Sequence, residues 1–135
     1  MNHQTIIVTL FVIIHHTIAS IHGGAHTELQ VLLTSAQNAF VYINIIAVPL
    51  IAVVLVWTRF ATTGLVILLI SMAGALAFDI YHHYILVSPD NIAHLPDGPV
   101  YHHHQFIWTA HALTIMQSVG VVLATYLLQQ VRVRH

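Results

Sequence analysis

The chain has 135 residues, of which 58% are hydrophobic and only 5% are charged, and its mean hydropathy is +0.84. This composition excludes an ordinary water-soluble domain and indicates one integral membrane domain, residues 1–135, without room for a separate soluble module. Lysine is absent and the formal net charge is −1, so nucleic-acid binding is not expected. The absence of cysteine excludes disulfides, thiolate metal sites and cysteine nucleophiles.

Four segments are apolar and long enough to cross a bilayer, which needs about 20 helical residues. The first span has the length of a signal-peptide core, but neither lysine nor arginine precedes it, so we expect it to be retained. The second span contains Pro49, which predicts a kink, and the third is rich in small residues that let helices approach closely. The expected transmembrane helices are residues 4–23, 29–57, 62–86 and 104–130, with an outer loop at 87–103.

The few charged residues predict how these helices are oriented. Arg59 follows the second span, and Arg132 and Arg134 follow the fourth, so all three lie on one side together with both termini. The positive-inside rule makes that side cytoplasmic. The predicted fold is therefore all-α, an integral membrane bundle of four transmembrane helices in the cytoplasmic (inner) membrane. Its termini are on the cytoplasmic side, and its opposite face is toward the periplasm or exterior.

Thirteen histidines are the unusual feature of this composition. Only His3 and His135 fall on the cytoplasmic side of the predicted topology. The other eleven converge on the outer side from three separated parts of the chain: His15, His16, His22 and His26; His82, His83 and His94; and His102, His103, His104 and His111. This convergence predicts a histidine-rich site in the outer half of the bilayer.

Depth along the helices groups these residues into layers. A rise of about 1.5 Å per residue places His15, Asp79 and His111 at similar depths, about 10–13 Å below the outer helix ends. A second layer close to the surface would contain His22, His83 and His104. Asp79 is the one acidic residue inside a predicted span, and an intramembrane carboxylate marks a candidate functional site.

Imidazole nitrogens and carboxylate oxygens together are typical ligands for divalent transition metals. Without thiolates, the composition favours copper first and zinc close behind, for metal binding, delivery or redox chemistry. The predicted ligands are His15, His83, His104 and His111, with Asp79 as a ligand or as the base that orients an imidazole, and with His22, His82 and His94 as further candidates. Which member of each histidine pair faces inward stays open, because a 100° rotation of the helix exchanges them.

Two other functions fit the same pattern. His15 and His111 at equal depth could hold haem b between two imidazoles, as in a b-type cytochrome. Alternatively, the chain could be an accessory subunit of a larger respiratory or oxygenase membrane complex, or a homo-oligomer, with the bilayer and its partner subunits as its contacts. The serines occur in no nucleophile motif, and the sequence leaves open whether the protein is an enzyme. For His3, His26, His102 and His135 we expect a role as anchors at the membrane interface.

Residues 71–96, SMAGALAFDIYHHYILVSPDNIAHLP, carry a resemblance. The run is similar to a stretch in small uncharacterised four-helix membrane proteins of bacteria, in which a YHH-like helix end is followed by SPD and HLP. It covers about a fifth of the chain and implies the four-helix membrane fold without an activity. Asp79 followed by His83 also resembles the D-x-x-x-H copper ligands of particulate methane and ammonia monooxygenases, which suggests copper as the metal.

Overall fold

The computed structural model describes residues 3–133, with side chains to residue 131, and this part of the chain is helical without any strand. Arg134 and His135 lie outside the described residues. The elements are α1 (His3–Glu28), α2 (Ser35–Phe40), η1 (Val41–Ala47), α3 (Val48–Val56), α4 (Ala61–Ile80), η2 (Tyr81–Ile85) and α5 (Val100–Val133). Both η segments are π-helices; α2, η1 and α3 form one continuous helix, and α4 continues into η2.

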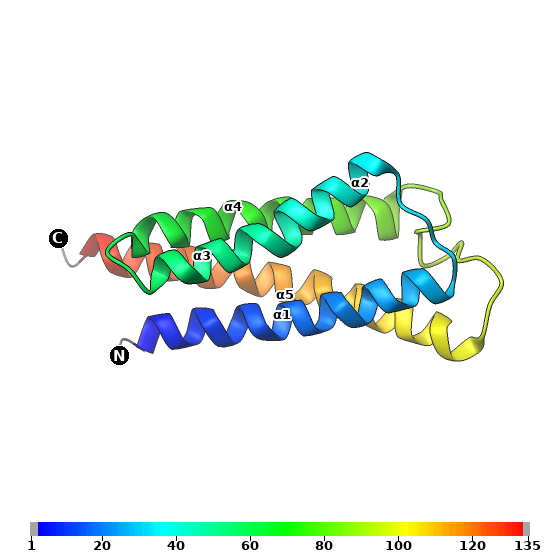
Figure 1. Ribbon diagram of the computed structural model, residues 1–135, viewed down its shortest axis with the longest axis horizontal. Helices are drawn as coiled ribbons and strands as arrows, with labels where there is room; N and C mark the ends of the chain where they lie inside the picture. Colours follow the sequence, from blue (N-terminus) through cyan, green and yellow to red (C-terminus); the bar gives the residue numbers. More distant parts are fainter. Residues whose placement is uncertain (1–2, 134–135) are drawn as a thin grey trace.

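Four long helices thus run side by side, and both ends of the described chain lie at one end of the bundle, which we call the terminal end (Figure 1). The opposite end carries residues 29–34 and 86–99, and we call it the histidine end. All four helices are long and apolar enough to cross a membrane, which confirms the predicted number of spans and the all-α class. Large apolar side chains such as Ile70 and Val122 point outward, as in helices that face lipid.

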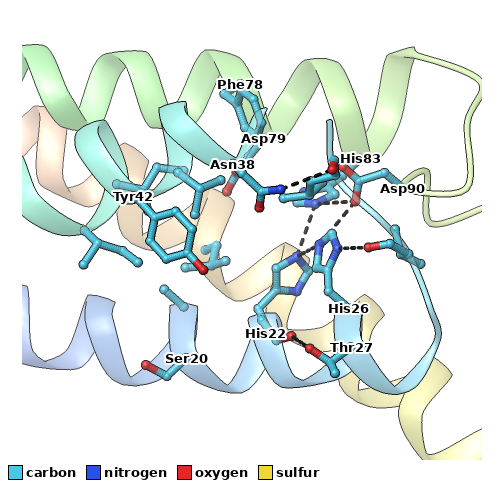
Figure 2. A pocket seen from close by; sticks show the side chains of 18 of the residues that line it. Ser20, His22, His26, Thr27, Asn38, Tyr42, Phe78, Asp79, His83 and Asp90 are labelled. Carbon is cyan, nitrogen blue, oxygen red and sulfur yellow. Dashed lines mark hydrogen bonds and ion pairs between the residues drawn. The ribbon is translucent and has the colours of Figure 1, made fainter. Parts of the chain in front are cut away.

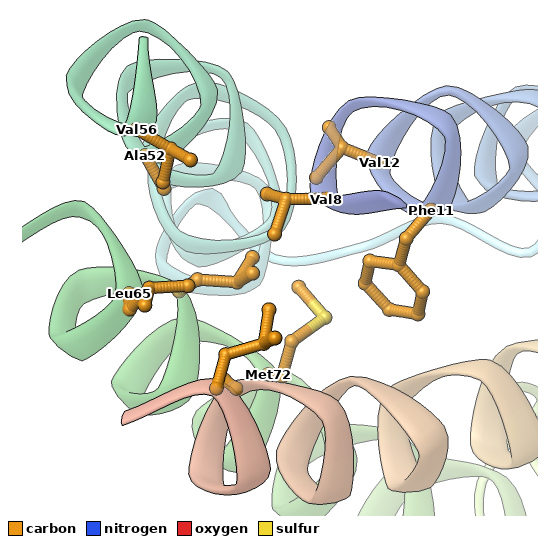
Figure 3. Close-up of a cluster of buried hydrophobic side chains, with 10 residues drawn as sticks. Val8, Phe11, Val12, Ala52, Val56, Leu65 and Met72 are labelled. Atoms are coloured by element: carbon orange, nitrogen blue, oxygen red, sulfur yellow. The ribbon is translucent and has the colours of Figure 1, made fainter. Parts of the chain in front are cut away.

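The terminal half of the bundle has an apolar core (Figure 3). Its buried members are Val8, Phe11, Val12, Ala52, Val56, Leu65, Leu68, Met72, Ala124 and Leu127. α3 and α4 approach closely here, because a Cβ added at Gly64 would lie 2.8 Å from the Ala52 carbonyl oxygen. This half of the bundle is therefore held together mainly by apolar contacts.

Helix α1 runs beyond the predicted residue 23 and ends in a motif that the hydropathy pattern does not show. Gln30 adopts a left-handed conformation with φ of 54°, its N–H donates to the Thr27 carbonyl, and the Val31 N–H donates to the His26 carbonyl. These are the two hydrogen bonds of a Schellman motif, which satisfies the last carbonyls of a helix. The extension places His26 on α1, in register with His22.

The second helix begins at Ser35, later than the predicted residue 29, because a capping box fixes its start. The Thr34 hydroxyl accepts from the Gln37 N–H, and the Gln37 side chain accepts from the Thr34 N–H. Further along this helix, η1 ends at Ala47, two residues before Pro49. Proline lacks an N–H and clashes with the carbonyl of the preceding turn, so a wider π-helical turn there has a physical cause.

The loop after η2 is packed against the bundle and is not a free connection. Asp90 and Asn91 are both buried, and the Asn91 amide donates to the Leu86 carbonyl while its oxygen accepts the Ala93 N–H. The Ile92 N–H donates to the His83 carbonyl at 3.1 Å. These bonds hold Asp90 beside the end of the third helix.

Candidate metal centre

Three histidines and one aspartate meet at the histidine end (Figure 2). His22 and His26 are one turn apart on α1, so their side chains share a face. His83 comes from η2 and Asp90 from the loop that follows it. The site therefore joins two helices and a loop that are far apart in the sequence.

The ligand-type atoms of these four residues form a closed ring of short distances. Nε2 of His22 lies 3.2 Å from Nε2 of His83 and 3.2 Å from Nε2 of His26. Oδ1 of Asp90 lies 3.3 Å from Nε2 of His83 and 3.3 Å from Nε2 of His26. The nitrogen atoms of the three histidines all lie within 4.8 Å of one another, close enough to hold one metal ion.

The other ring nitrogens of two histidines are engaged outside the cluster. His26 Nδ1 lies 3.1 Å from the Val31 carbonyl, which can only accept, so this nitrogen carries a hydrogen. His22 Nδ1 lies 2.8 Å from the Thr109 hydroxyl, whose single hydrogen is donated to backbone carbonyls of its own helix. The hydroxyl oxygen therefore accepts from His22, and Nδ1 of His22 is protonated too.

This assignment decides what the facing nitrogens present to each other. In a neutral imidazole with hydrogen on Nδ1, Nε2 carries a lone pair. When both rings are neutral, the Nε2 lone pairs of His22 and His26 thus lie 3.2 Å apart without a hydrogen between them. A metal ion would remove this repulsion by accepting both lone pairs, and partners on Nδ1 of this kind usually orient metal-bound histidines.

The surroundings keep water from the cluster on one side. Phe106 of α5 lies against His22, His26 and His83, with ring centroids separated by 4.6, 4.8 and 5.6 Å. His22, His83 and Asp90 are only 6%, 3% and 5% exposed. Burial in such a setting strengthens the interaction between a cation and its ligands.

Asp90 supplies the negative charge of the cluster. Burial alone would raise the pKa of this carboxyl, but its contact with His83 and the nearby His26 and His82 lower the pKa below its usual value. Both carboxylate oxygens are buried, and Oδ1 faces Nε2 of His26 and Nε2 of His83 at 3.3 Å each. A buried ionised carboxylate is suited to bind a cation, because an unpaired buried charge is costly.

Two of the eight predicted site residues, His22 and His83, lie in the cluster. Asp79 is buried one turn before His83 and accepts a hydrogen bond of 2.7 Å from Gln117, so it lies beside the cluster. His82 faces the other way, toward Gln37 and Phe78. The η2 segment thus directs His83, and not His82, into the bundle.

The remaining four predicted residues lie elsewhere. His15 is fully buried against Phe11, and neither of its ring nitrogens has a hydrogen-bond partner among the described residues. Nδ1 of His111 and the Tyr84 hydroxyl form a hydrogen bond of 2.8 Å. His94 and His104 are exposed at the histidine end.

Sequence reasoning missed two members of the cluster. His26, expected as an interface anchor, lies instead against His22 and Asp90. The spacing of four residues between His22 and His26 is a signal that could have identified the pair on one helix face. Asp90 carried no comparable signal, because its position depends on how the loop folds back.

Comparison with protein-family models, with curated proteins and with solved structures finds no match for this chain. The fold and the site define a four-helix protein whose helices are able to span a membrane and whose histidine cluster is able to hold a metal ion.

Proposed function

We propose that the protein is an integral membrane metal-binding protein, which holds one zinc or copper ion through His22, His26 and His83 with Asp90 as the fourth ligand. The observation that carries this proposal is the 3.2 Å distance between Nε2 of His22 and Nε2 of His26, with each imidazole held by a partner on its Nδ1. Neutral imidazoles and a carboxylate are ligands that both metals accept.

The types of ligand, and not the distances between them, favour zinc. A tetrahedral ion with bonds of about 2.0–2.1 Å has ligand atoms about 3.3–3.4 Å apart, whereas neighbouring ligands of a square-planar ion are about 2.8–3.0 Å apart. The four distances around the ring are 3.2, 3.2, 3.3 and 3.3 Å, between adjacent ligand atoms, and small side-chain shifts would fit them to either geometry. Three histidines and one carboxylate also suit the ligand preferences of zinc.

The location of the ion follows from the helices. The cluster lies at the end of the bundle opposite Arg59, the residue that the positive-inside rule places in the cytoplasm. We therefore propose that the bound ion lies near the periplasmic or exterior surface of the inner membrane. Metal binding or delivery at that surface is the role that these residues support best.

Metal analysis tests this proposal. Protein purified without a metal-affinity step and then equilibrated with micromolar zinc or copper should contain about one ion per chain by mass spectrometry. His83→Ala should lose that ion, because it removes the ligand that joins the third helix to the cluster. Wild-type protein that takes up neither metal would contradict the proposal.

His104→Ala is the matched control. His104 is one of the predicted ligands but is exposed, outside the cluster, so this variant should bind one ion like the wild type. If His104→Ala lost the ion and His83→Ala retained it, the metal would be bound by another set of histidines. Circular dichroism of both variants shows whether the helices are intact.

A further inference from the structure

A cavity of about 460 Å³ adjoins the histidine cluster, and the cluster forms one of its walls (Figure 2). Its size lies within the range of about 300–1,000 Å³ that is common for small-molecule sites. His22, His26, His83 and Asp90 all line it. A molecule in the cavity would therefore lie directly beside the proposed metal ion.

The fold leaves this space because two helices diverge. α1 packs against α5 and, near the terminal end, against α3, whereas α2 leans away from α1 toward the histidine end (Figure 1). The π-helical segment η1 supplies Val41, Tyr42, Ile45 and Ile46 to the wall opposite α1. Short π-helical segments occur frequently at functional sites, where they displace the side chains of a helix.

The walls of the cavity differ in chemistry. The cluster and Asp79 make one side polar, and Asp79 is held in place by its hydrogen bond from Gln117. Most of the remaining lining is aliphatic or aromatic and includes the side chains from η1. The described residues that line the cavity include two aspartates but neither lysine nor arginine, so an anionic ligand would have no cationic side chain to pair with.

We propose that this cavity binds a small uncharged amphipathic molecule, whose nitrogen or oxygen donor coordinates the metal ion and whose apolar body packs against Tyr42, Ile45 and Ile46. The donor would bind as an additional ligand or in place of the Asp90 carboxylate, since some zinc sites accept a fifth ligand. The inference rests on the proposed metal site, and it adds a ligand class to that site.

Cobalt(II) in place of the native ion makes the test visible, because its absorption spectrum reports changes of coordination. The cobalt-loaded protein is titrated with imidazole and with 4-phenylimidazole, which share a donor nitrogen but differ by an apolar ring. Burial of the ring should make 4-phenylimidazole bind at least about tenfold more tightly. Equal affinities for the two probes would overturn the cavity proposal while leaving the metal site intact.

A variant that fills the cavity tests where the preference arises. Ala19 lines the cavity on α1, so Ala19→Phe should keep the cobalt spectrum of the free protein but reduce the preference for 4-phenylimidazole to less than about threefold. Ala73→Phe is the control, because Ala73 is exposed on α4 and should leave the preference unchanged. If Ala19→Phe kept the full preference for 4-phenylimidazole over imidazole, the apolar ring would not bind in this cavity. A wild-type protein without a cobalt spectrum would instead overturn the metal site, and this inference with it.

Discussion

At the scale of the residue, the property that matters is which nitrogen of each imidazole carries hydrogen. The Thr109 hydroxyl and the Val31 carbonyl fix Nδ1–H on His22 and His26, which leaves both Nε2 lone pairs for a cation. Neither partner is charged or a ligand, and neither lies in a recognisable metal motif. Two residues that would not touch a bound ion therefore determine which nitrogens of the cluster are free to bind it.

Replacing Thr109 with valine tests this dependence. Thr109→Val keeps the shape of the side chain but removes the oxygen that accepts from His22 Nδ1, so zinc affinity should fall about 10- to 100-fold. Thr109→Ser keeps the hydroxyl and should bind zinc as the wild type does. Competition with a fluorescent chelator measures both affinities, and a Thr109→Val affinity within about twofold of wild type would refute the role of this bond.

Asp90 has a different role in the proposed site, because its negative charge would partly neutralise the bound ion. Asp90→Asn preserves the size of the side chain but removes the negative charge and weakens the oxygen as a ligand, so zinc affinity should decrease about tenfold or more. Asp97→Asn is the control, since Asp97 is exposed in the same loop. Chelator competition again gives the result, and equal affinities in the two variants would exclude Asp90 as a ligand.

At the scale of the element, close packing at one end of the bundle allows the helices to separate at the other. Gly64 brings α4 against the backbone of α3, and α2 then diverges from α1 where the cavity lies. The two π-helical segments lie in this divergent half, one in the wall of the cavity and one carrying His83. Their wider turns determine which side chains face inward.

Two glycine variants separate packing from helix propensity. In Gly64→Ala the new methyl meets the Ala52 carbonyl oxygen and Val56, so α3 and α4 must move apart, at a cost of about 1–3 kcal/mol in the free energy of unfolding. In Gly23→Ala the methyl has no neighbour within 4 Å, and the gain in helix propensity should stabilise the protein by up to about 1 kcal/mol. Unfolding in mixed micelles with increasing denaturing detergent measures both. The same sign of change in both variants would contradict the packing of α3 on α4.

At the scale of the whole molecule, the even number of helices places both ends of the described chain together and the histidine cluster at the opposite end. The absence of native cysteine makes the orientation simple to test with single cysteines. Asp97→Cys, at the histidine end, should react with a membrane-impermeant maleimide in intact cells. Thr58→Cys, in the connection between α3 and α4, should react only after the cells are permeabilised, and the reverse pattern would invert the predicted topology.

Composition and hydropathy were sufficient to predict the number and the approximate places of the four helices, because each segment must be apolar along most of its length to lie in lipid. They could not locate the start of α2 at Ser35 or the end of α1 at Glu28, since residues 29–34 are themselves largely apolar. Those boundaries depend on local hydrogen bonds, the capping box and the Schellman motif.

The sequence by itself determined that histidines from distant segments gather at one end of the bundle, because the order and length of the spans fix which end each helix terminus reaches. Only the tertiary structure decided which of them meet. The π-helical turn directs His83 into the cluster and His82 toward Gln37, and the folded loop brings Asp90 to the cluster. The orientation of a helical turn and the packing of a loop depend on contacts between distant segments. Such contacts produce no periodic pattern in the sequence, so the sequence does not predict them.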